Sequence, residues 1–557
     1  MKRYVHVLFI AAVACFLTQD VWAQGIRATV VGRVTDESGA VVPGVKITIT
    51  NVGTNESRTV VTSDTGDYVM PQLPPGDYSL TTEMIGFSKV MQRFVLETGQ
   101  GARVDVVLRA GAIAEQVDVT AASPIVSTED ASIGNVVDQK KIVELPLNGR
   151  DYLQLAQLQP NVFAPAQNST LGFRGGFNVS GNSEVANNYI KDGIDNNDET
   201  TNQPLHRPIL DAVLEFKVLT GTYAAEYGRQ AGGQIIVTTK SGTNEFHGSA
   251  FEFHRNSVLD ARNYFAPQKP SFRRNQFGGV IGGPIQRDRT FFFTGYEGQR
   301  RGQQEAGLAA VPTLAMKQGD FSALLPTTVI RNPFDNNQPF TGNRIPQSLW
   351  HAQGAGLLAL YPDPNASGQN NFVSTGTGRF SMDQFSGRID HQVSDKASIF
   401  GVYEFADSSE FFPISNPLCS ARDVPGWGCD EQQRTQHLAL VWTHVISPRL
   451  VNDARIGYSR FGFYRLQEDR DKDVVNRLGI RGLTDAGQTP FNNGSPELRV
   501  TGFAIIGGPT NLPQGRHDNT YHYVENMTFN QGKHTMKWGL DIRRFHFNSF
   551  LDRKSVV

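Results

Sequence analysis

The sequence predicts a mainly β protein in which an N-terminal β-sandwich and an α+β domain precede part of an antiparallel transmembrane β-barrel. The first observation behind this prediction is an export signal followed by no apolar run of the roughly 20 residues that a membrane helix needs. The second is a composition of 55 Gly and 35 Phe at a mean hydropathy of −0.33, typical of a β protein rich in turns and aromatics. The third is a C-terminal half in which strand-like segments are joined by alternating short and long connections.

A secretory signal peptide is predicted over residues 1–23. Lys2 and Arg3 precede an apolar core, and Ala23 ends a small-residue cleavage site. An alternative lipoprotein signal would use Cys15, but the residues before it lack the usual leucine. The charge balance of 52 Lys and Arg against 54 Asp and Glu gives no argument for a nucleic-acid partner.

Two cysteines, Cys419 and Cys429, remain after signal removal and predict one local disulfide in an exported protein. Two free thiols are the alternative. Neither cysteine has a histidine at zinc spacing, so no metal site and no other cofactor is predicted. The sequence shows no convincing Gly-x-Ser-x-Gly, zincin or P-loop pattern, and we therefore do not expect an enzyme.

Residues 24–110 alternate short strands with Gly- and Pro-rich turns, which predicts a small β-sandwich. The motifs DTGDY at 64–68, PPGDY at 74–78 and IGF at 85–87 resemble the carboxypeptidase regulatory-like domain. This resemblance implies an accessory module, and the chain has no His-Glu-x-x-His pair of a peptidase. Related sandwiches can bind carbohydrate, but the favoured interpretation is a rigid domain that extends outside the rest of the protein.

Residues 111–123 form a linker of small residues that contains the sequence EQVDVTA at 115–121. This sequence resembles the TonB box of TonB-dependent outer-membrane receptors, an extended segment that adds as a strand to TonB in the periplasm. The resemblance implies that TonB contacts Glu115, Gln116, Val117, Asp118, Val119, Thr120 and Ala121.

Residues 124–244 resemble the plug domain of the same receptors. The sequences LPLNGRDY at 145–152 and EYGRQAGGQIIVTTKSGTNEFHG at 226–248 are similar to the Oar-like branch of TonB-dependent transporters. A helical turn is expected within 136–145, and a second helix after it with Leu153, Leu155 and Leu158 on its apolar side.

Three aspartates of the plug, Asp192, Asp195 and Asp198, raise the possibility of a calcium site. Their spacing does not fit an EF-hand loop, and the required glycine at the sixth position is missing. A solvated Asp-Gly turn is therefore predicted at this position.

Residues 245–557 contain about nine strand-like segments of the length that a barrel strand needs. They lie near 246–256, 274–284, 289–299, 381–392, 396–407, 434–446, 450–463, 519–531 and 534–547. Short connections at the periplasmic side alternate with the longer segments 257–273, 300–380, 408–433 and 464–518 outside. In the first strand Phe251 and Phe253 are expected to face lipid. Because a plug-filled barrel has about 22 strands, the N-terminal part of a barrel is expected.

The resemblance implies a TonB-dependent transporter in the outer membrane of a Gram-negative-type bacterium, with its N-terminal and plug domains in the periplasm or the barrel lumen. Its implied partners are TonB with its inner-membrane energising complex, outer-membrane lipid and an extracellular ligand of unknown class. The alternative function is an adhesion or carbohydrate-binding surface protein that uses the barrel as an anchor. Energy-dependent uptake of a ligand distinguishes the two, because an anchor binds without uptake.

Overall fold

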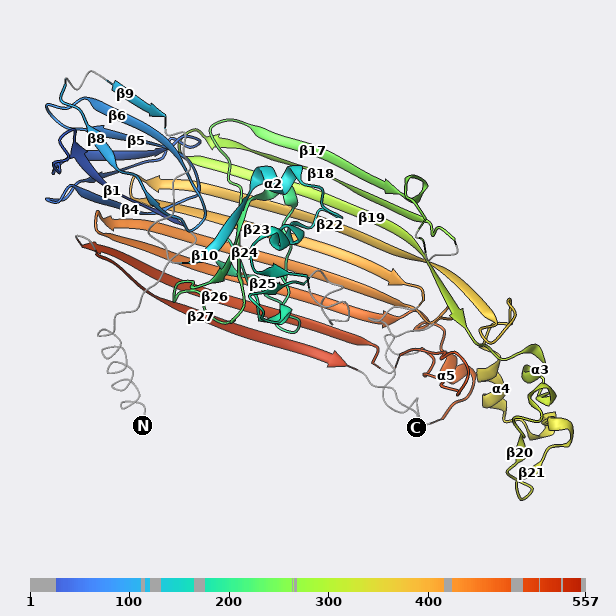
Figure 1. The fold of residues 1–557 in the computed structure, drawn as a ribbon. Coiled ribbons are helices and arrows are strands. Elements are labelled where there is room, and N and C mark those ends of the chain that lie inside the picture. The colour runs from blue at the N-terminus through green and yellow to red at the C-terminus, as the bar shows by residue number, and fades with distance from the viewer. Residues whose placement is uncertain are drawn as a thin grey trace, which may run out of the picture.

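The computed structural model divides the chain into a sandwich, a plug and a large curved sheet (Figure 1). It describes residues 27–111, 132–164, 176–262, 264, 268–414, 423–481, 494–509, 511–531 and 534–551, together with the backbone of 116–120. The predicted signal peptide lies outside these residues. Over the part described, no helix is both long and apolar enough to cross a membrane.

The sandwich packs a four-stranded sheet against a five-stranded sheet, as its alternating pattern predicts. The first sheet contains β1 (Ala28–Asp36), β4 (Asp67–Leu73), β7 (Gly101–Arg103) and β8 (Val106–Leu108). The second has the order β3 (Ser57–Val61), β2 (Lys46–Asn51), β5 (Gly76–Glu83), β6 (Lys89–Leu96) and β9 (Gln116–Thr120). Alternate apolar side chains such as Ile47, Ile49 and Leu80 are fully buried between the sheets.

The plug is built on a five-stranded mixed sheet. Its order is β10 (Ile133–Asp138), β15 (Val213–Gly221), β16 (Gln234–Thr239), β13 (Asn188–Lys191) and β14 (Ile194–Asp195). A smaller pair joins β11 (Val162–Phe163) to β12 (Asn178–Val179). The core beside this sheet includes the aromatic residues Tyr152, Phe177, Tyr189 and Phe216. Strand β13 pairs in parallel with β16, and this pairing determines the position of the turn between β13 and β14.

Of the two helical predictions in the plug, the first is confirmed and the second needs correction. The segment 136–145 contains α2 (Gln139–Glu144) directly after β10, and Asp138 caps the helix by accepting a hydrogen bond from the Lys141 amide at 2.9 Å. The next helix is the 3₁₀ segment η2 (Tyr152–Leu158). Leu153 and Leu155 are buried as expected, but Leu158, the last residue of the segment, is exposed.

The third part is a nine-stranded antiparallel sheet, which confirms the predicted number of strands and the fold class. Each strand pairs with its neighbours in the chain, and β17 and β27 are the two edges of this open sheet. The strands are β17 (His247–Asn256), β18 (Phe272–Gln286), β19 (Thr290–Ala309), β22 (Phe372–Ser394), β23 (Ala397–Phe412), β24 (Cys429–Ser447), β25 (Leu450–Gln467), β26 (Gln514–Gln531) and β27 (His534–Leu551).

Most of these strands extend further than predicted toward the long connections. The segment 300–380, expected to be one loop, contains the end of β19, the start of β22 and a small lobe between them. The lobe contains α3 (Leu314–Lys317), the β20 (Arg331–Asn332) and β21 (Gln338–Pro339) pair, and α4 (Ala352–Leu358). The prediction missed the strand ends because, beyond the membrane, barrel strands lose the apolar alternation that marks them. A further short helix, α5 (Val474–Arg477), lies between β25 and β26.

The direction of the first strand's aromatic residues was predicted wrongly. Phe251 and Phe253 lie 4.1 and 4.6 Å from the guanidinium of Arg150 in the plug, so they face the lumen. Ser249, on the same face, is 3.4 Å from Asp211 of the plug. A buried arginine stacks well on aromatic rings, which gives these phenylalanines an inward partner that local alternation cannot reveal.

Candidate functional site at the plug–barrel interface

A tight hairpin of the plug inserts against the inner face of the barrel wall. It runs from Lys191 to Asp195, and we call it the KDGID hairpin. Asp192 and Gly193 both have positive φ, at 48° and 82°, which suits a two-residue Asp-Gly turn. A Cβ atom on Gly193 would lie 2.5 Å from a guanidinium nitrogen of Arg455, so the close approach to the wall requires glycine.

Lys191 supplies the positive charge of this hairpin and is fully buried. Its ammonium is paired with the carboxylate of Glu404 on β23, and both side chains have 0% exposure. His206 approaches the same carboxylate with Nε2 at 3.8 Å and contacts Thr435 Oγ1 with Nδ1 at 2.9 Å. Complete burial lowers the pKa of Lys191 to about 7, an effect that the neighbouring Asp192 opposes. The Lys191 ammonium therefore loses its proton at a lower pH than the ammonium of a surface lysine would.

The next residue, Asp192, joins the turn to strand β22. Its carboxylate lies 3.5 Å from Arg388 and accepts a hydrogen bond from the Thr239 amide at 3.0 Å. Arg388 is also paired with Asp390 at 2.7 Å and donates to the Thr239 carbonyl at 3.1 Å. One arginine of the wall thus binds both the hairpin and the end of β16.

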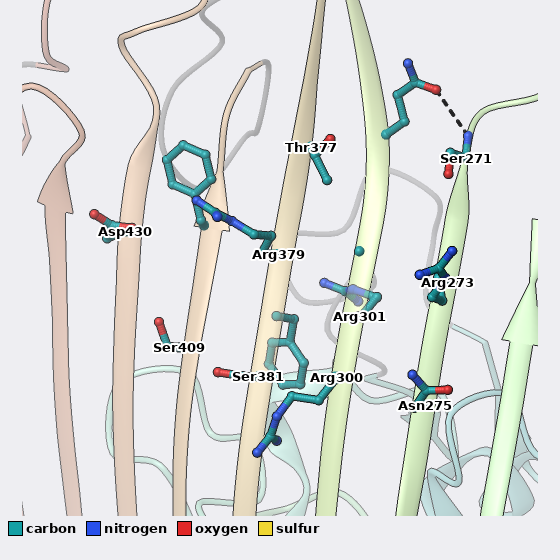
Figure 2. A pocket seen from close by; sticks show the side chains of 14 residues that line it. Ser271, Arg273, Asn275, Arg300, Arg301, Thr377, Arg379, Ser381, Ser409 and Asp430 are labelled. Atoms are coloured by element: carbon teal, nitrogen blue, oxygen red, sulfur yellow. Dashed lines mark hydrogen bonds between the residues drawn. The ribbon is translucent and has the colours of Figure 1, made fainter.

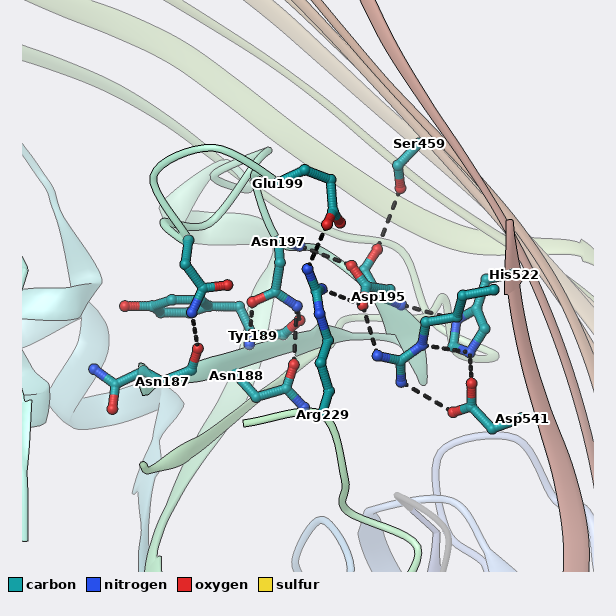
Figure 3. A network of polar contacts seen from close by, with 12 residues as sticks. Asn187, Asn188, Tyr189, Asp195, Asn197, Glu199, Arg229, Ser459, His522 and Asp541 are labelled. Atoms are coloured by element: carbon teal, nitrogen blue, oxygen red, sulfur yellow. Dashed lines mark hydrogen bonds and ion pairs between the residues drawn. The ribbon is translucent and has the colours of Figure 1, made fainter. Parts of the chain in front are cut away.

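Asp195 is the centre of the polar network drawn in Figure 3. Its carboxylate accepts from Arg229 of the plug at 2.8 Å and from Arg543 of β27 at 2.9 Å. Its backbone amide donates to Nδ1 of His522 at 3.1 Å. His522 in turn lies 3.0 Å from Asp541, so the network continues into the wall.

These contacts contradict the predicted solvated turn. Asp192, Asp195 and Asp198 are all buried, and Asp198 is paired with Arg516 of β26 at 2.6 Å. Arginines from strands about 200 to 350 residues away neutralise them, which sequence spacing does not show. Within the described residues, no group of three or more His, Cys, Asp or Glu side chains is placed to hold a metal ion.

Apolar contacts between plug and wall are few and local. Ile194, at the tip of the KDGID hairpin, packs among Val402, Ala439 and Val441. Gly457 makes room for it, because a Cβ there would lie 2.2 Å from the Ile194 side chain. A second small cluster packs Ile209 and Ala212 of the plug against Val280 and Phe293 of the wall. The interface therefore combines many ion pairs and hydrogen bonds with two small apolar contacts.

A cavity of about 300 Å³ lies between the plug and the wall strands. The plug contributes Gly149–Tyr152, Pro204, Leu205, Arg207 and Pro208, and the wall contributes mainly polar side chains such as Gln276, Glu297 and Gln433. Most of its wall residues lie at the midpoint of their strands or nearer the long connections. Such a cavity is at the lower end of the size range of small-molecule sites.

The sandwich contacts both the plug and the rim of the barrel wall, so it packs against these two parts of the protein. The Thr98 amide donates to Glu215 of β15, and Thr98 Oγ1 lies 2.8 Å from Thr238 Oγ1 of β16. Burial raises the pKa of Glu215 to about 6. Asn55 also donates to Asp288 at 2.8 Å in the first short turn of the wall.

The structure describes only part of the residues predicted as functional. Of the TonB-box residues, 116–120 form β9, whose backbone pairs in parallel with β6, whereas Glu115 and Ala121 lie outside the described residues. Cys429 is in a disulfide, but Cys419 lies outside the described residues, so their pairing stays a prediction.

Sequence reasoning missed the wall residues that hold the plug. Arg388, Glu404 and Arg543 are charged side chains at inward positions of otherwise alternating strands. A charge that faces a lumen filled by protein needs a partner there. The charged sequence of the KDGID hairpin is the complementary signal that could have indicated this contact.

Comparisons with known proteins agree with this geometry. A family model described as an outer membrane beta barrel domain matches residues 238–555, more than half of the chain. The chain belongs to this outer-membrane β-barrel family. Residues 29–109 match the carboxypeptidase regulatory-like domain, as the sequence motifs predicted.

This barrel protein is also similar to the TonB-dependent transporter Oar of Myxococcus xanthus, with 32% identity over 287 residues. The match covers 48% of this chain and 26% of that transporter. Among solved structures, it is similar to the outer membrane transporter YddB of Escherichia coli, with a TM-score of 0.47, 10% identity and coverage of 75% and 48% of the two chains. The siderophore receptor PirA of Acinetobacter baumannii gives a TM-score of 0.40, 17% identity and coverage of 75% and 54%.

The family places this barrel protein in the outer membrane, as predicted. The suspected relationship to TonB-dependent receptors of the Oar-like branch is confirmed. The curated relative is a transporter by name. It spans about a quarter of the length of the Oar transporter.

Proposed function

We propose that this protein imports a ligand across the outer membrane and that TonB drives the import by displacing the plug. The relationship to a TonB-dependent transporter supports transport over the alternative of a surface anchor. The ligand first occupies the 300 Å³ cavity on the plug, whose polar wall suits a small polar molecule.

The polar plug–wall interface is the observation that carries this proposal. Lys191, Asp192 and Asp195 hold the plug through charged partners, and Ile194 supplies the main apolar contact of the KDGID hairpin. A buried ion pair adds specificity but little net stability, since desolvation offsets most of the attraction. When water enters the lumen, the separated charges are solvated again. The plug is thus positioned accurately yet can be removed without exposing a large apolar surface.

The edge position of strand β9 supports its proposed role as the contact for TonB. Strand β9 is the last strand of its sheet, next to β6, so one edge of its backbone is unpaired within that sheet. An incoming strand of TonB would add to this edge through backbone hydrogen bonds. The chain continues directly from this strand to the plug, so a pull on β9 would be transmitted to the plug.

Proline substitution tests the proposal at the backbone. In an extended strand adjacent N–H groups point to opposite edges, so the double variant Asp118→Pro and Val119→Pro removes donors from both edges. We expect binding of the periplasmic domain of TonB in a pull-down titration to fall at least tenfold, and energy-dependent uptake to stop.

The matched control is the double variant Asp118→Ala and Val119→Ala, which removes the side chains but keeps every amide. Its binding should remain close to that of the wild type. Full TonB binding by the proline variant would show that this segment is not the contact.

A further inference from the structure

We infer that the outward face of the barrel wall carries a binding site for the phosphorylated sugar headgroup of an outer-leaflet glycolipid. The site is a cavity of about 830 Å³ between β18, β19, β22, β23 and β24, near their ends at the long connections. Four arginines line it: Arg273, Arg300, Arg301 and Arg379 (Figure 2). The inference is independent of transport.

The direction of the strand side chains places the site outside the lumen. Arg274 donates to Asn148 of the plug at 3.1 Å and Gln276 donates to the Gly149 carbonyl at 3.2 Å, so both face inward. Because side chains alternate along a strand, Arg273 and Asn275 face outward. A ligand that passes through the lumen would therefore not meet Arg273.

The strand register carries this outward face across the neighbouring strands. Asn275 pairs with Arg300, and Arg300 pairs with Ser381. Gly302, which pairs with Arg273 on one side, pairs with Arg379 on the other. Arg273, Arg300 and Arg379 thus belong to one outward surface, whereas Arg301 starts from the inner face.

An apolar and aromatic band lies directly beneath this surface, toward the short turns. On the same outward face Tyr296, Phe385 and Ile389 are exposed by 41%, 45% and 55%. The Phe277 ring lies under the Arg300 guanidinium, 5.9 Å from its carbon to the ring centroid. Aromatic girdles mark the membrane interface of outer-membrane barrels, so the arginines lie at the level of the lipid headgroups.

The charge of the cavity favours an anion. Arg300 is paired with Asp383 at 2.8 Å, Arg301 is paired with Glu410, and Asp430 at the rim is paired with Arg470 at 2.7 Å. Within the described residues, neither Arg273 nor Arg379 has a carboxylate partner, and both are exposed. The Arg379 guanidinium lies 5.4 Å from the centroid of the Phe411 ring, a contact that leaves its N–H groups available. An arginine without a carboxylate partner can bind a phosphate through two parallel hydrogen bonds.

The remaining lining of the cavity suits a sugar. Its hydroxyl and amide side chains are Ser271, Thr377, Ser381, Ser409, Asn275 and Gln304. Phosphate-binding arginines with hydroxyl and amide groups between them, above an apolar band for acyl chains, match a phosphorylated glycolipid. A phospholipid headgroup offers one phosphate and few hydroxyl groups, which would leave much of this lining without a partner.

The test compares two double variants of the protein, purified in detergent. Arg273→Gln with Arg379→Gln removes the two unpaired charges of the cavity. Arg460→Gln with Arg544→Gln is the matched control, because both arginines are exposed on the same outward face but lie on β25 and β27, away from the cavity. The probe is lipid A that carries both of its phosphates, measured by fluorescence polarisation, with dephosphorylated lipid A and inorganic phosphate as separate arms.

We expect the affinity for phosphorylated lipid A to fall roughly 20-fold in the cavity variant and less than threefold in the control. Arg273→Lys with Arg379→Lys should keep most of the affinity, because a charge remains at each position. An equal loss in the two glutamine variants would overturn the inference, as would no loss in either. Tight binding of inorganic phosphate alone, with no gain from the lipid, would overturn it too, as would equal affinity for dephosphorylated lipid A.

Discussion

The buried pair Lys191–Glu404 gives the sharpest test of how the plug is held in the barrel. Glu404→Gln leaves an ammonium with 0% exposure and no opposite carboxylate, while Lys191→Met leaves an equally buried carboxylate. Removing one partner of a buried ion pair costs about 3–5 kcal/mol, because the remaining charge is desolvated without compensation. Each single variant should therefore lower the free energy of plug opening by at least about 3 kcal/mol.

The double variant Lys191→Met with Glu404→Gln should behave differently. It removes both charges and keeps nearly the same side-chain volumes, and such replacements of buried pairs are often close to neutral. We expect the double variant to cost no more than either single variant. The magnitude of the coupling energy is then at least about 3 kcal/mol, at or above the upper end of the range for residues in contact.

Plug opening can be measured by thiol labelling of the protein in outer-membrane vesicles. Ala156 is fully buried in the plug core, so the thiol of Ala156→Cys reacts only when the plug opens. Cys429 is held in a disulfide and does not compete. The dependence of the labelling rate on urea gives the free energy of opening for each variant.

A surface pair provides the control for this cycle. Arg434 and Asp407 form an ion pair on the outward face with 57% and 43% side-chain exposure. Replacing both with Met and Asn should change plug opening by less than about 1 kcal/mol. If the Lys191 and Glu404 variants are additive, so that the double variant costs the sum of the single ones, the two residues do not hold the plug as a pair and the reasoning is refuted.

Two further predictions concern the sandwich and the hairpin tip. Because burial raises the pKa of Glu215 to about 6 from an ordinary 4.5, the docked sandwich favours the protonated carboxyl. Docking should be strongest below pH 4.5 and weaken as the pH rises through 6, by up to about 2 kcal/mol. Energy transfer between labels on sandwich and plug measures this, and a pH response that persists in Glu215→Gln would contradict it. Gly457→Ala should destabilise the closed plug by about 1–3 kcal/mol, because its Cβ would lie 2.2 Å from the Ile194 side chain. Combining it with Ile194→Ala should cost less than the sum of the single changes in the labelling assay, whereas strict additivity would show that the two sites do not touch.

Local pattern was sufficient to predict much of this fold. The nine wall strands follow from alternation. The sandwich follows from its turn motifs, whose Gly and Pro positions constrain the backbone locally. In these segments, the residues that determine the local structure lie within about ten positions of one another, so a single sequence is enough to recognise them.

The partners of inward-facing side chains could not be predicted. Phe251 and Phe253 alternate as lipid-facing residues would, yet Arg150 of the plug lies against them. Asp192 and Asp195 lie in a sequence typical of a surface turn, yet Arg388 and other arginines of the wall bury it. Alternation shows that a strand has two faces, but it does not show whether the inner face meets water or protein.

The amino-acid sequence by itself determined the strands, the order of the sandwich, plug and barrel parts, and the family, because these depend on spacing and on short motifs. Only the tertiary structure decided which charges join plug to wall, where the sandwich docks and which arginines face the lipid. Those contacts link residues that lie hundreds of positions apart. Their energies depend on burial and mutual distance, and neither quantity exists until the chain has folded.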